Sequence, residues 1–225
     1  MILEPNYMNS ANSSIKTLAI KSIASYRNKY NSFPETILDI GACIGLYSLR
    51  ISQMSTKSHI YAFEPVTVSY NIFMNNIKSN NIQNITAINK GIYYKRDVLK
   101  MSLPMPDTLP KHVLDSNGNP GLGRYSIFDW KDNYNVISAE FDTIESLMHE
   151  YTIPVADIIK MDCEGCESLI IKSSEIIFKR CKIVVTEHNK TFDPDDELSK
   201  ILIDLGFETL NTGLDRIWIN KNTKK

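Results

Sequence analysis

The segment at residues 37–48 limits the possible folds of this chain more than any other. It begins with the apolar run Ile37-Leu-Asp-Ile40, passes through Gly41 and Gly45, and then returns to an apolar pattern. This order predicts a buried strand, a tight turn and the start of a helix. Because glycine carries no side chain, we expect the turn to let a ligand lie directly against the backbone.

A second apolar run, at residues 60–63, leads directly into Glu64 and Pro65. Glu64 follows the glycine turn by about 20 residues, where nucleotide-binding βαβ units place the carboxylate that holds the ribose hydroxyls. The turn reads D-x-G-x-x-x-G and lacks the middle glycine of the dinucleotide fingerprint G-x-G-x-x-G. An adenosine without phosphates needs only one close approach, at its amino-acid tail. The pattern therefore favours S-adenosylmethionine over NAD.

The composition indicates one globular domain and excludes several classes of protein. The chain has 225 residues, of which 43% are apolar, and a formal net charge of −1. We expect a single domain over residues 1–225, with a full core and no strong field to attract nucleic acid. No run is long enough to span a membrane and the N-terminus lacks a signal-peptide pattern, so we expect a cytoplasmic protein.

The four cysteines are expected to be reduced, because no secretion signal is present. Cys163 and Cys166 have the spacing of half a zinc site. No second C-x-x-C or H-x-x-x-H pair completes that site, so a structural zinc is not expected.

Apolar periodicity divides the chain into an α/β core and an insertion. An N-terminal lead over residues 1–34 contains a predicted helix at 9–29. Strands are predicted at 36–40, 60–63, 85–89, 156–161 and 182–186, and helices at 44–54, 66–79, 143–151, 167–179 and 194–205. Residues 207–210 and 214–219 should form an antiparallel hairpin. We therefore expect an α/β protein with a seven-stranded, Rossmann-like and mostly parallel sheet.

Residues 91–142 interrupt the α/β pattern. Short alternating runs at 98–103, 125–130 and 136–141 are separated by stretches rich in proline and glycine. We expect an inserted β-rich segment here. Its glycine-rich part, at 116–123, could cover a site or form a plain surface ribbon. We expect contacts with the acceptor from this insertion and from the N-terminal helix.

The carboxyl ends of the strands should form the site, because open α/β sheets bind ligands there. The backbone near Gly41 and Gly45 should contact the amino-acid tail of the cofactor, with Asp39 ordering the turn. Asn89 or a backbone carbonyl would have to accept from the adenine amino group, since no acid follows the third strand. The predicted cofactor-binding residues are Asp39, Gly41, Ala42, Cys43, Gly45, Glu64, Pro65, Asn89, Gly91 and Asp162.

The fourth core strand is followed by three acids, Asp162, Glu164 and Glu167. Clustered carboxylates repel one another, and a cluster with this energetic cost favours a functional role over plain surface exposure. Alternatively, Glu167 could simply stabilise a helix N-terminus. Asp162 is the first candidate for positioning the acceptor or removing its proton, and Glu164 is the second. His188 follows the fifth strand and could act as a base, because the unperturbed pKa of histidine lies nearest neutrality.

A divalent metal ion is an alternative use of the same strand ends. Oxygen donors together with an imidazole suit Mg²⁺ or Mn²⁺. The candidate ligands are Asp162, Glu187, His188 and Asn189.

Four blocks of this sequence resemble the FkbM-type S-adenosylmethionine-dependent methyltransferases. They cover residues 38–45, 61–65, 117–126 and 158–167, and the last reads as an apolar strand followed by K-x-D-x-E-G-x-E. The resemblance implies a seven-stranded methyltransferase fold and methyl transfer, usually to a hydroxyl. Cys43 departs from the family pattern, which usually has a small polar residue there, often asparagine.

The leading hypothesis is an O-methyltransferase that acts on a small hydroxylated acceptor, with a sugar or glycan as the favoured class. One alternative is an RNA 2′-hydroxyl methyltransferase, which needs a Lys-Asp-Lys-Glu set. Its residues would be Lys16 or Lys21, Asp162, Lys190 and Glu208, but the near-neutral charge argues against a groove that follows phosphates. A second alternative is an inactive cofactor-binding scaffold, against which the retained strand-end acids argue.

Overall fold

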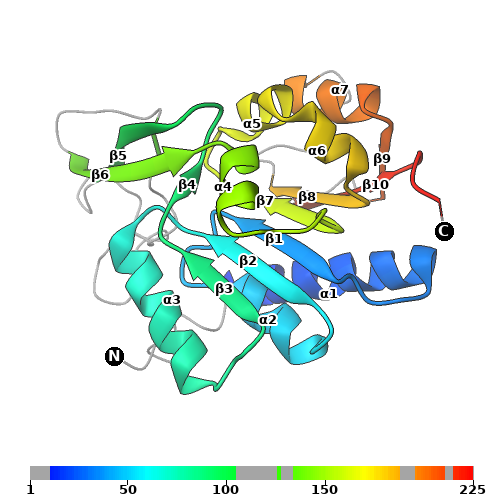
Figure 1. The fold of residues 1–225 in the computed structure, drawn as a ribbon, viewed down its shortest axis with the longest axis horizontal. Coiled ribbons are helices and arrows are strands. Elements are labelled where there is room, and N and C mark those ends of the chain that lie inside the picture. The colour runs from blue at the N-terminus through cyan, green and yellow to red at the C-terminus, as the bar shows by residue number, and fades with distance from the viewer. Residues whose placement is uncertain (1–10, 105–125, 128–133, 188–195, 211–214, 225) are drawn as a thin grey trace.

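The computed structural model describes residues 11–104, 126–127, 134–187, 196–210 and 215–224. In these residues one sheet has seven strands (Figure 1). Their order across the sheet is β3 (Ile85–Ile88), β2 (His59–Phe63), β1 (Thr36–Ile40), β7 (Ile158–Met161), β8 (Ile183–Glu187), β10 (Asp215–Asn220) and β9 (Phe207–Thr209).

The pairing of these strands confirms the predicted fold class. The strands from β3 to β8 are parallel to their neighbours, whereas β10 is antiparallel to both β8 and β9. The predicted mostly parallel sheet with a C-terminal antiparallel hairpin is therefore correct. Ligands of such sheets bind at the carboxyl ends of the parallel strands.

Helices cover both faces of the sheet (Figure 1). One face carries α1 (Ala11–Tyr30), α2 (Leu46–Met54) and α3 (Thr67–Ser79), and the other carries α4 (Ile144–Glu150), α5 (Glu167–Ser173), α6 (Glu175–Arg180) and α7 (Glu197–Asp204). Successive strand residues point to opposite faces, so Ile37 and Leu38 belong to different core clusters and both are fully buried. Burial of each such side chain contributes roughly 1.5–3 kcal/mol.

The insertion forms a second, three-stranded sheet beside the carboxyl ends of the core strands (Figure 1). Its strands are β4 (Gly91–Ile92), β5 (Asp97–Pro104) and β6 (Tyr134–Asp142), with β6 in the middle. The predicted runs at 98–103 and 136–141 are therefore strands. Of the predicted run at 125–130, only Ser126 and Ile127 are described, and Ser126 pairs with Ser102. The glycine-rich part at 116–123 lies outside the described residues.

The single helix predicted at 167–179 is wrong, because Ser174 divides it into α5 and α6. Ser174 has φ −133° and ψ 30°, and its hydroxyl donates to Glu145 over 3.0 Å. The neighbouring Ser173 hydroxyl bonds to the Ile170 carbonyl. Serine side chains compete with the helical backbone in this way, and an apolar periodicity does not register that competition.

No helix in the part of the chain that the structure describes has the length and apolar character needed to cross a membrane.

The turn after β1 is held between the ends of β2 and β7. The backbone N–H groups of Gly41 and Ala42 both donate to the Phe63 carbonyl over 3.0 Å, and the Asp162 N–H donates to Ile40 over 3.1 Å. Gly41 has φ +74°, and a Cβ at this position would lie 2.0 Å from the Asp162 carbonyl oxygen. Only glycine allows the turn to approach β7 this closely.

We expect Gly41→Ala to lower the free energy of unfolding by about 2 kcal/mol or more, because it adds a backbone clash to left-handed strain. Urea denaturation would measure the loss. Gly206→Ala is the matched control, since Gly206 also has positive φ (+92°) but its Cβ would meet only the Asn222 side chain. The control should lose about 1 kcal/mol. Equal losses in the two variants would contradict the proposed close approach.

Candidate functional site

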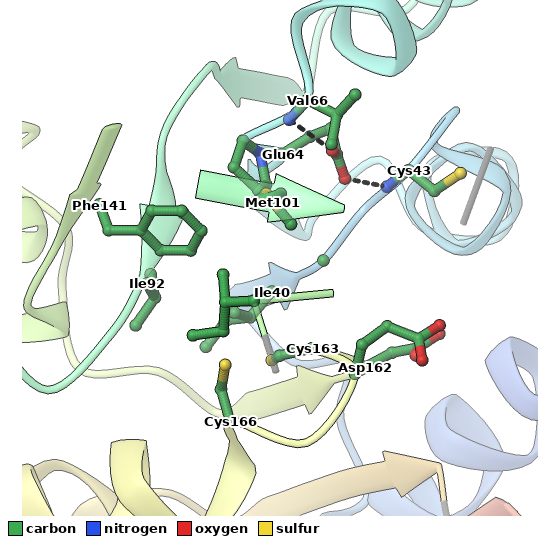
Figure 2. A pocket seen from close by; sticks show the side chains of 15 residues that line it. Ile40, Cys43, Glu64, Val66, Ile92, Met101, Phe141, Asp162, Cys163 and Cys166 are labelled. Atoms are coloured by element: carbon green, nitrogen blue, oxygen red, sulfur yellow. Dashed lines mark hydrogen bonds between the residues drawn. The ribbon is translucent and has the colours of Figure 1, made fainter. Parts of the chain in front are cut away.

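A cavity opens at the carboxyl ends of β1, β2 and β7 and extends against the inserted sheet (Figure 2). Its walls come from strand-end loops that are far apart in the sequence. The lining residues are Ile40, Gly41, Cys43, Glu64, Pro65, Val66, Gly91, Ile92, Met101, Ile127, Phe141, Asp162, Cys163, Glu164 and Cys166.

Glu64 is a buried acid on the wall of this cavity, with 5% of its surface exposed. One carboxylate oxygen accepts from the Cys43 N–H over 2.8 Å and the other from the Val66 N–H over 2.7 Å (Figure 2). These bonds connect the loop after β1 to the loop after β2. Burial raises the pKa of Glu64 to about 7, although both hydrogen bonds and the nearby Lys160 favour the charged form.

The structure gives a different reason for the two glycines of the turn from the one that the sequence suggested. Gly41 lines the cavity, but its missing side chain makes room for the backbone of Asp162. Gly45 is buried, and a Cβ there would lie 2.0 Å from the Phe73 ring. Packing within the protein thus requires both glycines. Between them, Cys43 adopts a left-handed conformation with φ 52°, and its N–H donates to Glu64.

Asp39 lies behind the cavity lining, where it bonds to the helix that follows the turn. It is fully buried and accepts from the Ser48 hydroxyl of α2 over 2.6 Å. Its other carboxylate oxygen lies 3.1 Å from Nζ of Lys160. Asp39 and Lys160 are register partners on neighbouring strands β1 and β7, so they project from the same face of the sheet.

Lys160 is a residue to which the sequence analysis assigned no role. Its Nζ donates to the Gly41 carbonyl over 2.8 Å and lies 3.7 Å from a carboxylate oxygen of Asp162. Burial would lower the pKa of this lysine, but Asp39 and Asp162 outweigh that effect and raise it. Lys160 therefore stays charged at neutral pH. A lysine within the buried strand Ile158-Ile-Lys-Met161 was the available signal.

The three acids after β7 have different surroundings. Asp162 lines the cavity with 33% of its side chain exposed, and the exposed Glu164 lines it in a left-handed conformation with φ 53°. Glu167 points back into its own loop, where it accepts from the N–H groups of Cys163 over 2.7 Å and Gly165 over 3.1 Å. Burial raises the pKa of Glu167. Glu167 thus stabilises the entry into α5.

Asn89 fixes the loop after β2 and does not line the cavity. Its amide group donates to the carbonyls of Glu64 over 2.8 Å and Pro65 over 3.3 Å, and its oxygen accepts from Thr67. Asp39, Ala42 and Gly45 also lie behind the lining, whereas the other predicted cofactor residues form part of it.

The inserted sheet supplies an apolar wall that the sequence analysis missed. Ile92 of β4, Met101 of β5 and Phe141 of β6 all line the cavity, together with Ile127. Gly91 lies under the Phe141 ring, which would be 2.2 Å from a Cβ at this position. Alternation in β5 and β6 could have identified Met101 and Phe141 as inward-facing, but not what they face.

Three of the four free cysteines, Cys43, Cys163 and Cys166, line the cavity. Burial raises the pKa of the Cys43 and Cys166 thiols to about 12, and it also raises the pKa of Cys163. The thiols are therefore protonated at neutral pH, and protonated thiols are poor nucleophiles.

Several predicted residues cannot be placed in the cavity. His188, Asn189 and Lys190 lie outside the described residues, and of Glu187 only the strand position in β8 is described. Among the described residues, no group of three or more histidine, cysteine or acidic side chains is arranged to hold a metal ion. Lys21 is exposed on α1, and Glu208 is exposed on the edge strand β9, three positions away from β7 in the sheet.

A known protein family and a known methyltransferase both match most of this chain. Residues 39–209 match the family described as the methyltransferase FkbM domain. The chain is 25% identical over 192 residues to methyltransferase sdnD of Sordaria araneosa, covering 76% of this chain and 73% of that protein.

Two solved structures share the fold. The precorrin-6y C5,15-methyltransferase of Geobacter metallireducens GS-15 has a TM-score of 0.51 at 13% identity, covering 90% of this chain and 86% of that chain. Cofactor-bound Rv0187 from MTB also has a TM-score of 0.51, at 7% identity, covering 94% of this chain and 81% of that chain. The family match, which spans most of the chain, confirms the resemblance seen in the sequence. This chain belongs to the FkbM methyltransferase family and is an S-adenosylmethionine-dependent methyltransferase.

Proposed function

We propose that this enzyme methylates a hydroxyl group of a small acceptor, with a sugar or glycan as the favoured class. The observation that carries the proposal is the shared cavity of Glu64 and Asp162, which come from the ends of different parallel strands. One acid is suited to hold the cofactor, and the other is suited to receive an acceptor hydroxyl. Carboxylates are strong hydrogen-bond acceptors for hydroxyl groups.

The residues of the cavity fit S-adenosylmethionine. Glu64 offers a buried carboxylate whose remaining lone pairs can accept from the two ribose hydroxyls. Ile92, Met101 and Phe141 form apolar surface suited to a flat purine ring. The turn containing Gly41 and Cys43 presents backbone at the end of β1, on the side of the amino-acid tail. In this assignment Asn89 supports the loop after β2, to which its side chain is hydrogen-bonded.

Asp162 is our proposed acceptor-binding residue. The bound cofactor supplies an electrophilic methyl group, so the protein must align an acceptor oxygen with it and remove a proton from that oxygen. Asp162 lines the cavity with its carboxylate partly exposed, where an acceptor hydroxyl can reach it. Glu164 lies two residues further along the same wall and is the second candidate. His188 remains a proposed base.

We also propose that the enzyme works in a reducing compartment such as the cytoplasm. The four free thiols support this assignment, since disulfides are rare where glutathione and thioredoxin keep cysteines reduced.

We expect the affinity for S-adenosylhomocysteine to fall as the pH drops below about 7, the pKa of Glu64 in the ligand-free protein. Ribose hydroxyls donate to the ionised carboxylate, so binding at lower pH must release a proton, which costs up to about tenfold in affinity per pH unit. Titration calorimetry between pH 5.5 and 8 would measure this dependence. Glu64→Gln should bind about tenfold more weakly at pH 8 and lose the dependence. A wild-type affinity that is flat with pH would place the ribose elsewhere.

Asp162→Asn should leave the affinity for S-adenosylhomocysteine within about threefold of wild type, while turnover falls by about 100-fold or more, the scale of a lost general base. Single-turnover methyl transfer and calorimetry on the same preparation separate the two effects. Glu167→Gln is a control at a neighbouring acid that faces its own loop. Full turnover by Asp162→Asn would remove this residue from the mechanism.

The acceptor class can be tested with S-adenosylmethionine carrying an isotope-labelled methyl group. Sugars, glycosides, nucleosides and short RNAs would be offered in parallel, and products analysed by mass spectrometry and NMR. We expect a labelled methyl ether on a small hydroxylated acceptor. A labelled amine, ester or carbon-bound methyl group would contradict O-methylation, and transfer confined to RNA would contradict the small acceptor.

A further inference from the structure

Lys160 occupies an unusual electrostatic position next to the cavity. The cavity wall carries the acids Glu64, Asp162 and Glu164, and none of the described residues that line it is basic. Asp39 adds a fourth carboxylate directly behind the wall. Lys160, with 6% of its surface exposed, is a cation beside two of these acids, Asp39 and Asp162.

The contacts of Lys160 join the parts of the protein that would surround the reacting sulfur. Its Nζ donates to the Gly41 carbonyl over 2.8 Å, in the turn assigned to the amino-acid tail. The same Nζ lies 3.1 Å from Asp39 and 3.7 Å from Asp162, the acid assigned to the acceptor. The Tyr47 ring lies beneath it, with its centroid 6.0 Å from Nζ. The ammonium group of Lys160 thus holds the turn after β1 and the end of β7 in fixed relative positions.

We propose that Lys160 is a positioning residue that orients Asp162 and moderates the negative charge of the cavity, and thereby sets the preference for S-adenosylmethionine over S-adenosylhomocysteine. This inference rests on the proposed function of the cavity. The two compounds share their ribose, base and amino-acid groups, but only S-adenosylmethionine has a positively charged sulfur. Carboxylates near the sulfur favour the cation, and an ammonium group beside them reduces that preference.

The reduction of negative charge near the sulfur by Lys160 also affects turnover. The positive charge of the sulfonium disperses as the methyl group moves, so an unopposed carboxylate cluster would stabilise the ground state more than the transition state. Such a cluster would also bind S-adenosylmethionine tightly without accelerating its reaction. Lys160 opposes both effects while holding Asp162 in place.

The test is the ratio of the two affinities, measured by titration calorimetry on the full chain with S-adenosylmethionine and S-adenosylhomocysteine. Lys160→Met should shift this ratio toward S-adenosylmethionine by about tenfold, the order expected for a unit charge in a partly screened site. Asp162→Asn should shift it several-fold in the opposite direction. Lys160→Arg retains the charge and should keep the ratio near wild type.

Lys182→Met is the matched control. Lys182 also pairs with an aspartate, Asp157, over 2.8 Å, and bonds to Tyr26, but it precedes β8 at the opposite end of the sheet. This variant also loses a lysine–aspartate ion pair, although a more exposed one, and should leave the affinity ratio unchanged. A purely structural role of Lys160 would lower both affinities in parallel and leave the ratio at its wild-type value.

An unchanged ratio in folded Lys160→Met would overturn the inference. If that variant does not fold, Asp162→Asn decides, because a ratio that stays at the wild-type value would show that the sulfur does not sense these charges. Tight binding of both compounds that is unaffected by Glu64→Gln would instead contradict the assignment of the cavity as the cofactor site. The two failures are therefore distinguishable.

Discussion

The close approach of the β1 turn to the end of β7 is the constraint on which the rest of the site depends. Gly41 lies against the backbone of Asp162, and Lys160 spans the same junction by bonding to the Gly41 carbonyl. Glu64 fastens the other side of the turn through Cys43. These contacts hold the carboxyl ends of β1, β2 and β7 together as one rim of the cavity. Under the proposed function, the groups that bind the cofactor and the acceptor are held in place before either compound binds, and such preorganisation is how a positioning enzyme gains rate.

Features that depend on local sequence patterns were predicted, whereas features that depend on contacts between distant residues were missed. Apolar runs and the glycines between them were sufficient to predict where the core strands lie along the chain, and that Glu64 and Asp162 follow β2 and β7. The purpose of Gly45 could not be read locally, since Phe73 lies 28 residues further along the chain. The pairing of Asp39 with Lys160 depends on the register of two strands 121 residues apart. Opposite charges inside two buried strands were the available clue.

The insertion contributes directly to the walls of the cavity. It was expected to contact the acceptor, yet Ile92, Met101 and Phe141 line the same cavity as Glu64. The core strand ends and the insertion thus line one cavity together. The apolar end of the cavity arises from the inserted sheet. One face of this small sheet covers the carboxyl ends of the core strands, and the residues on that face are apolar.

The way the small sheet is attached gives the fold freedom to diversify. The chain leaves the core through β4 and returns through β6, and these strands are paired as Gly91 with Phe141 and Ile92 with Asp142. Exit and return are therefore adjacent, so chain length between them can change at an entropic cost that grows only logarithmically. Under the proposed function, lengthening or shortening the chain between β4 and β6 is a route to new acceptor preferences that leaves the strand-end rim and its chemistry intact.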